Sequence, residues 1–127
     1  MNQTLIKNIN IWTMDERDSR FFGWILLENN RIASMGEGEP PTMSVMIDGD
    51  VIDGEGGVLT PGLIDIHSHI GLYEDGLGFE GADGNEDTDP ATPHLRALDG
   101  VNPFDRSFRE ALEAGVTAAA VSPGSAN

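Results

Sequence analysis

The stretch that decides the fold is Thr60-Pro61-Gly62-Leu63-Ile64-Asp65-Ile66-His67-Ser68-His69. Its apolar part predicts a short strand, in which successive side chains point to opposite faces. Asp65, His67 and His69 then share one face, whereas the isoleucines make the other face apolar enough to pack beneath helices. This division is typical of a barrel strand whose carboxyl end holds a polar site.

The two histidines of this stretch form a candidate metal site. At positions i and i+2 of a strand their β-carbons are about 6–7 Å apart, which allows both rings to reach one cation. Asp65 lies one step deeper on the same face, where we expect it to orient an imidazole or to contact the cation directly. The chain has no cysteine, so a metal would depend on histidines and carboxylates. The spacing alone is a weak signal, because two histidines on a strand also occur by chance.

The segment after residue 100 carries the signals of a helix followed by a strand. Asn102 is predicted to be the N-cap, Pro103 the first helical residue and Gly115 the left-handed terminator. Residues 116–121 are predicted to form a strand of small residues. Together with the strand that ends at the histidines, this order predicts a parallel βαβ unit.

Residues 1–60 are predicted to form a small antiparallel β module without a reactive constellation. Leu5, Ile9 and Ile11 share one parity, an imperfect period-two pattern. Residues 21–27 and 31–35 are predicted strands joined by a tight hairpin turn at Asn29-Asn30, because asparagine tolerates positive φ. Brief strands are predicted at the segments 44–48 and 51–53.

Between the histidines and residue 100 lies a long acidic, glycine-rich segment, predicted to be a loop with one helical turn near residues 93–98. His94 and Arg96 in this loop are candidate substrate-binding residues, with an ordinary surface role as the alternative. The run 83–89 resembles the start of a calcium loop. Its sixth position is Thr88 instead of glycine and its twelfth is His94 instead of glutamate, which argues against calcium.

Charge and composition exclude several classes of protein. The 127 residues include 22 acidic and 7 basic side chains, for a net charge of −15. This sign argues against binding to nucleic acid or to anionic lipid. The apolar runs are far shorter than a membrane span, and the first residues lack the pattern of a signal peptide. We therefore expect a cytoplasmic protein.

Four segments resemble a known enzyme family. The run from Pro61 to His69 resembles the first-strand signature of the metal-dependent amidohydrolase superfamily, and Gly115-Val116-Thr117 resembles the start of its second barrel strand. The segments 80–86 and 92–96 resemble bacterial amidohydrolases related to imidazolonepropionase. The resemblance extends over essentially the whole chain, and the strand signature is its most specific part.

The resemblance implies a fold that is mainly β with an α/β portion. Residues 1–60 would belong to a small antiparallel β-sandwich, and residues 61–127 would form the first two strands and one helix of an incomplete TIM (β/α)8 barrel. It implies His67 and His69 as ligands of a divalent metal, with Zn²⁺ expected first and iron or manganese as alternatives. A metal-activated water would then hydrolyse a non-peptide C–N bond, as in a cyclic amide or a related small molecule.

The superfamily takes its remaining ligands and a catalytic aspartate from later barrel strands. A TIM barrel needs about 250 residues. We therefore expect the chain to be the amino-terminal piece of a longer enzyme, to contain no catalytic residue of its own, and to be inactive by itself.

A second interpretation is a β-rich interaction or assembly module whose histidines are incidental. A half-built barrel exposes a strand edge and the apolar face of Ile64 and Ile66, which would permit a homo-oligomer or a swapped dimer. Metal titration of the His67→Ala and His69→Ala variants distinguishes the two interpretations.

Overall fold

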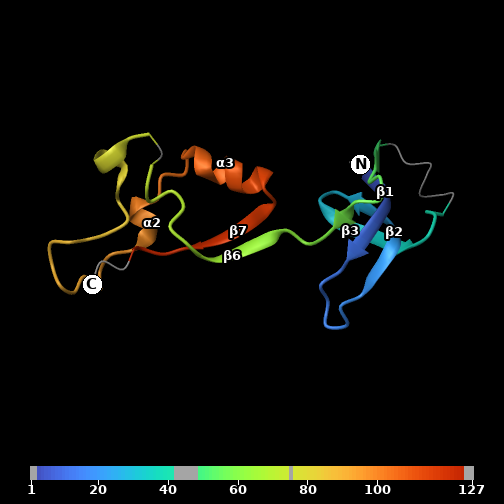
Figure 1. The fold of residues 1–127 in the computed structure, drawn as a ribbon, viewed down its shortest axis with the longest axis horizontal. Helices are drawn as coiled ribbons and strands as arrows, with labels where there is room; N and C mark the ends of the chain where they lie inside the picture. Colours follow the sequence, from blue (N-terminus) through green and yellow to red (C-terminus); the bar gives the residue numbers. More distant parts are fainter. Residues whose placement is uncertain (1–2, 42–48, 75, 125–127) are drawn as a thin grey trace. The chain divides into compact units, whose positions relative to one another are not determined.

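The computed structural model describes residues 3–41, 49–74 and 76–124. The chain divides into two compact units, Met1–Pro61 and Gly62–Asn127 (Figure 1). The secondary structure is mainly β, with few helices, as the sequence predicted. No helix in these described ranges is long and apolar enough to cross a membrane.

The first unit is built on one sheet, whose central strands form two hairpins. Its strands are β1 (Gln3–Trp12), β2 (Arg20–Glu28), β3 (Arg31–Glu37), β4 (Gly49–Asp53) and β5 (Val58–Leu59). The order is β3-β2-β1-β4, and β5 also pairs with β1. The predicted turn between β2 and β3 is confirmed, because both Asn29 and Asn30 have positive φ, at 48° and 64°. The predicted strand at 44–48 lies outside the described residues.

The sheet is mixed, so the prediction of an antiparallel module was wrong for part of it. Strand β2 runs antiparallel to β1 and β3, whereas β4 and β5 run parallel to β1. A parallel pair requires a crossover connection instead of a tight turn. The turn-like composition of the sequence between β3 and β4 gave no sign of the direction in which the chain would return.

A β-bulge in β1 divides the core of this unit between the two faces of the sheet. The pairing shifts by one residue between Ile6 and Ile9, around Asn8, whose φ is +54°. An extra residue reverses the faces of all side chains that follow it. One buried cluster therefore contains Leu5, Trp24 and Leu26, and a second contains Ile9, Ile11 and Ile25.

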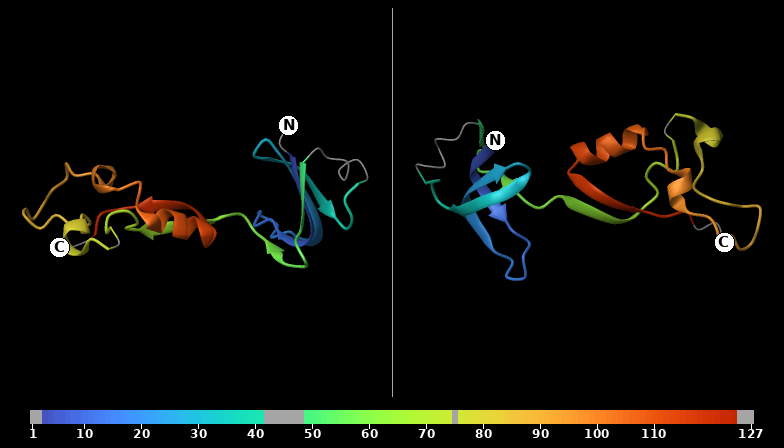
Figure 2. Two further views of the ribbon diagram at one scale, coloured as in Figure 1. Left: turned by 90° about the horizontal axis from the view of Figure 1, so that it is seen from above. Right: turned by 180° about the vertical axis from the view of Figure 1, so that it is seen from behind.

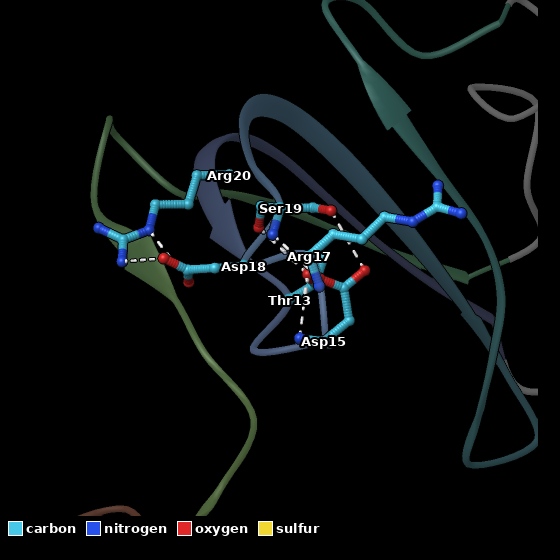
Figure 3. A network of polar contacts seen from close by, with 6 residues as sticks. All are labelled: Thr13, Asp15, Arg17, Asp18, Ser19 and Arg20. Carbon is cyan, nitrogen blue, oxygen red and sulfur yellow. Dashed lines mark hydrogen bonds and ion pairs between the residues drawn. The ribbon is translucent and has the colours of Figure 1, made fainter.

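The turn between β1 and β2 is held by Asp15 (Figure 3). Its Oδ1 accepts hydrogen bonds from the backbone N–H groups of Arg17 (3.2 Å) and Ser19 (3.0 Å), and its Oδ2 lies 3.1 Å from the Ser19 hydroxyl. The backbone hydrogen bond from Ser19 is the largest of the effects that lower the pKa of the Asp15 carboxyl below its usual value. Arg20, which follows, pairs with Asp18 and lies over the ring of Trp12, 4.4 Å from its centroid.

The second unit contains the predicted strand–helix–strand arrangement. Strands β6 (Leu63–Ser68) and β7 (Val116–Val121) pair in parallel, and helix α3 (Arg106–Glu113) comes between them in the sequence. The two views of Figure 2 show α3 beside β7. The connection from β6 to α3 includes the 3-10 turn η1 (Gly78–Gly81) and the short helix α2 (Ala97–Gly100). The predicted helical turn at 93–98 therefore lies a few residues further along the chain.

The start of α3 differs from the prediction, and its end agrees. Asp105 is the N-cap, and its carboxylate accepts a hydrogen bond from the backbone N–H of Ser107 at 2.7 Å. Asn102 instead closes the preceding turn, where its Oδ1 accepts from the N–H of Phe104 at 3.0 Å. Both residues are good caps, so the sequence offered two starting points. Gly115, with φ of +92°, ends the helix as predicted.

Candidate metal centre and adjoining cavity

His67 and His69 lie side by side at the carboxyl end of β6. Their ring centroids are 5.4 Å apart, and the ring planes are nearly perpendicular, at 88°. His67 is exposed and His69 is half-buried. The two imidazoles that the sequence placed on one face are therefore close enough in space to share a small ligand. Their role as metal ligands stays a prediction.

A hydrogen bond to the residue that follows β7 fixes the tautomer of the neutral His69 ring. Nδ1 of His69 lies 2.7 Å from the carbonyl oxygen of Ser122. A carbonyl can only accept, so Nδ1 carries the proton and the lone pair of the neutral ring is on Nε2. The parallel register places this carbonyl, because the N–H of Ser122 donates to the carbonyl of Ser68 at 3.0 Å. A histidine that binds a metal through one ring nitrogen usually donates a hydrogen bond of this kind from the other nitrogen.

Asp65 supports the histidine pair through the backbone. Its Oδ1 accepts a hydrogen bond from the backbone N–H of His67 at 3.1 Å. This contact fixes the backbone at His67 and does not orient the imidazole ring. The expected contact of Asp65 with an imidazole or a cation stays a prediction.

The donor set is compatible with part of a metal site. Two neutral imidazoles, one of them with Nε2 as its free nitrogen, are suitable ligands for zinc and related ions. A closed zinc site needs four ligands. Over residues 3–41, 49–74 and 76–124, no group of three or more His, Cys, Asp or Glu side chains is placed to hold a metal. His67 and His69 would therefore be part of a ligand set, not the whole of it.

Tyr73 is the next aromatic ring beside the histidines. Its centroid lies 6.2 Å from that of His69 with the rings at 79°, a favourable edge-to-face contact. Its hydroxyl accepts a hydrogen bond from Nδ2 of Asn85 at 3.1 Å. Tyr73 was not among the residues predicted from the sequence, although it is an aromatic residue only four positions after a candidate ligand.

A cavity of about 630 Å³ lies between the long loop and the end of β7. It is lined by Leu72, by residues 83–86, by parts of the segment 92–100 and by Pro123 and Gly124. Asn85, the partner of Tyr73, is one of the lining residues. This volume is sufficient for a small-molecule ligand.

The two predicted substrate residues differ in their relation to this cavity. Arg96 lines it, and Asp99 holds the guanidinium through two hydrogen bonds of 2.7 and 3.0 Å, which raise the pKa of Arg96 above its usual value. His94 is not a lining residue, but it interacts electrostatically with Glu86, which lines the cavity. The pKa of Glu86 is lowered chiefly by hydrogen bonds from the hydroxyl and the backbone of Thr88, and to a smaller extent by the charge of His94. The roles of His94 and Arg96 as substrate contacts stay predictions.

Comparison with known proteins identifies the family. No protein-family model matches the chain. The chain is 35% identical over 141 residues to the amidohydrolase tasK of Hapsidospora irregularis, a match that covers 98% of the chain. The crystal structure of an amidohydrolase from Thermotoga maritima matches over 98% of the chain with 42% identity and a TM-score of 0.76. The chain belongs to the amidohydrolase superfamily. The imidazolonepropionase of Treponema denticola is 36% identical over 53 residues, or 42% of this chain.

The chain spans only part of the length of these proteins. It covers 14% of the Hapsidospora protein, 13% of the Treponema protein and 30% of the Thermotoga structure. The matches of the preceding paragraph confirm, at the level of the superfamily, the resemblance deduced from the strand that carries His67 and His69.

The contact with the Ser122 carbonyl could not be predicted from the sequence, because a backbone carbonyl has no side-chain signature.

Proposed function

We propose that this chain supplies the first part of a metal-dependent amidohydrolase that hydrolyses a non-peptide C–N bond in a cyclic amide or related small molecule. The observation that carries the proposal is the hydrogen bond of 2.7 Å from His69 Nδ1 to the Ser122 carbonyl. It leaves Nε2 of His69 as the free nitrogen, next to the ring of His67. The family relationship supports hydrolysis as the reaction class.

In this proposal β6, α3 and β7 are the first βαβ unit of a TIM barrel, and the sheet of residues 1–60 belongs to a β-sandwich. Active sites of such barrels gather at the carboxyl ends of the strands. His67 and His69 are at that end of β6, and Ser122 follows β7. The remaining ligands and the catalytic aspartate would come from later strands, so we expect the chain to have no hydrolase activity by itself.

Each residue has a defined task in the proposed site. When bound, a divalent ion, in the first place Zn²⁺, would supply Lewis-acid activation of water and of the scissile group. His67 and His69 would hold it through their imidazoles, Ser122 would keep the proton on Nδ1 of His69, and Asp65 would hold the backbone at His67. Arg96 at the cavity, with His94 in the same loop, would contact the substrate.

The test is a titration of the chain with Zn²⁺, followed by NMR of the histidine rings. The chain has three histidines. His67→Ala and His69→Ala are expected to weaken Zn²⁺ binding at least about tenfold. His94→Ala is the matched control and should bind as the wild type does. An excess of Mg²⁺ occupies the many carboxylates, so that the readout is specific for imidazole. The proposal would be contradicted if all three variants bound Zn²⁺ as tightly as the wild type, or if His94→Ala weakened Zn²⁺ binding as much as His67→Ala and His69→Ala do.

One observation favours a second candidate, an assembly surface. Ile64 and Ile66 on β6 are 70% and 84% exposed, and β6 pairs only with β7 in the described sheet. Apolar side chains beside an open strand edge favour association. Sedimentation velocity distinguishes the cases. A dimer that dissociates when Ile66 is changed to Lys supports association of copies through this face, whereas a monomeric wild type argues against it.

A further inference from the structure

The backbone at Tyr73 is fixed by pairing with the loop segment that follows it. Tyr73 forms an antiparallel bridge with Ala82. On either side of this bridge, the N–H of Glu74 donates to the carbonyl of Gly81 and the N–H of Asp83 to that of Leu72, both at 2.8 Å. The preceding residue, Leu72, is 2% exposed. The position from which the tyrosine ring projects is therefore well defined, although the ring itself is 44% exposed.

Two glycines make room for the ring. A β-carbon at Gly84 would lie 2.1 Å from Cζ of Tyr73, and one at Gly124 would lie 2.2 Å from Oδ1 of Asn85 and 3.1 Å from the Tyr73 hydroxyl oxygen. The N–H of Gly124 donates to the carbonyl of Gly84 at 2.6 Å, which joins the loop to the end of β7. With Asn85 bound to the hydroxyl at 3.1 Å, the phenol ring is held at its far end by the loop.

The Tyr73 ring also contacts His69. The edge-to-face geometry, with centroids 6.2 Å apart, is in the attractive range for aromatic pairs. His69 also meets His67 nearly at right angles and donates to Ser122. A half-turn of the imidazole about its bond to Cβ would break the hydrogen bond to Ser122 and exchange the positions of nitrogen and carbon atoms. Neighbouring rings that limit rotation of the His69 imidazole therefore determine which of its nitrogens is left without a proton.

We propose that Tyr73 is a positioning residue for His69: held by Asn85 and by the space at Gly84 and Gly124, its ring keeps His69 in the orientation in which Nδ1 donates to Ser122 and Nε2 is free. This inference rests on the proposed function for its purpose, because the free Nε2 would be the metal ligand. Its structural content is a property of the metal-free chain and can be measured there.

The experiment measures the tautomer of His69 in the full, metal-free chain, by long-range ¹H–¹⁵N NMR at a pH where the imidazoles are neutral. The wild type is expected to show His69 with its proton on Nδ1. Tyr73→Phe retains the ring and should retain this tautomer. Tyr73→Leu should give an exchanging mixture of both tautomers. Phe79→Leu is the control, since Phe79 is an aromatic residue of the same unit with 91% of its side chain exposed, and it should leave His69 unchanged.

The inference is overturned if Tyr73→Leu keeps the wild-type tautomer, or if the Phe79 control changes it equally. Should Tyr73→Leu fail to fold, Gly84→Ala takes its place, because it displaces the ring without removing it. It must then produce the same mixture, and an unchanged tautomer overturns the inference.

A Zn²⁺ titration of the same variants separates this inference from the proposed function. Tyr73→Leu is expected to bind Zn²⁺ about tenfold more weakly than the wild type, with both histidines intact. If neither the wild type nor any variant binds Zn²⁺, but the His69 tautomer still depends on Tyr73, the positioning role is supported and the proposed metal site is refuted. If Zn²⁺ binds through both histidines, but the His69 tautomer is the same with and without Tyr73, the metal site is supported and the positioning role is refuted.

Discussion

Replacing Gly84 by alanine tests how tightly the structure holds the Tyr73 ring. The new β-carbon would lie 2.1 Å from Cζ of Tyr73, whereas non-bonded carbons rest about 3.5–4.0 Å apart. The φ of Gly84 is not positive, so alanine introduces no backbone strain there. The overlap must therefore be relieved by displacement of the ring.

The expected cost follows from what the displaced ring loses. The edge contact with His69 is worth about 0.5–1.5 kcal/mol, and the hydrogen bond from Asn85 about 0.5–1.5 kcal/mol. Because the ring is half exposed, it can swing into solvent and avoid the larger costs of an overpacked core. The free energy of unfolding of the second unit should fall by about 1–3 kcal/mol.

The assay is urea unfolding followed by ¹⁹F NMR of the chain labelled with 3-fluorotyrosine. Tyr73 is the one tyrosine of the sequence, so a single resonance reports the second unit. Both tryptophans, Trp12 and Trp24, belong to the first unit, and the fluorescence midpoint should not move. Gly100→Ala is the control: its β-carbon would lie 3.2 Å from Cδ2 of Leu72, a contact that a small movement of that side chain relieves, and alanine favours the helix by up to about 1 kcal/mol. A Gly84→Ala chain with the wild-type midpoint and fluorine shift would refute the reasoning.

Two further predictions concern the first unit. Leu5→Ala should lower the free energy of unfolding of this unit by about 2–5 kcal/mol, because Leu5 is fully buried against Trp24. Urea unfolding monitored by tryptophan fluorescence measures this change. A midpoint equal to that of the wild type would show that the cluster does not stabilise the sheet. For Asp15, the hydrogen bonds led by the Ser19 N–H lower the carboxyl pKa in the folded chain, so its contribution to stability is present above the unfolded pKa of about 3.9 and is lost as the pH falls through the folded value. Asp15→Asn should remove that part of the acid dependence, and an unchanged slope of stability against pH from about pH 5 downwards would contradict the assignment.

Local signals in the sequence determined several elements of this protein. The asparagine pair predicted the hairpin between β2 and β3, because few residues accept two successive positive φ angles. Gly115 predicted the end of α3 for the same kind of reason. The alternation in β6 placed His67 and His69 on one face, and their rings are indeed adjacent. Each of these features depends on the conformational preference of a few neighbouring residues.

The surroundings of the histidine pair could be predicted only in part. The hydrogen bond from His69 to Ser122 depends on the register between β6 and β7, strands that are far apart in the sequence. The place of Tyr73 depends on Gly84 and Gly124, whose lack of side chains has meaning only once the ring lies against them. No local pattern contains this information.

The division of the core shows the same limit in the first unit. By sequence, Leu5, Ile9 and Ile11 share one parity and would face the same side of a regular strand. The sequence alone therefore established that β1 is a strand with buried aliphatic side chains. The tertiary structure decided the rest: the bulge at Asn8 turns Ile9 and Ile11 to the face opposite Leu5, and β4 returns parallel to β1. The physical reason is that a strand's faces and neighbours are set by pairing with distant segments, whereas its tendency to be extended is set by its own residues.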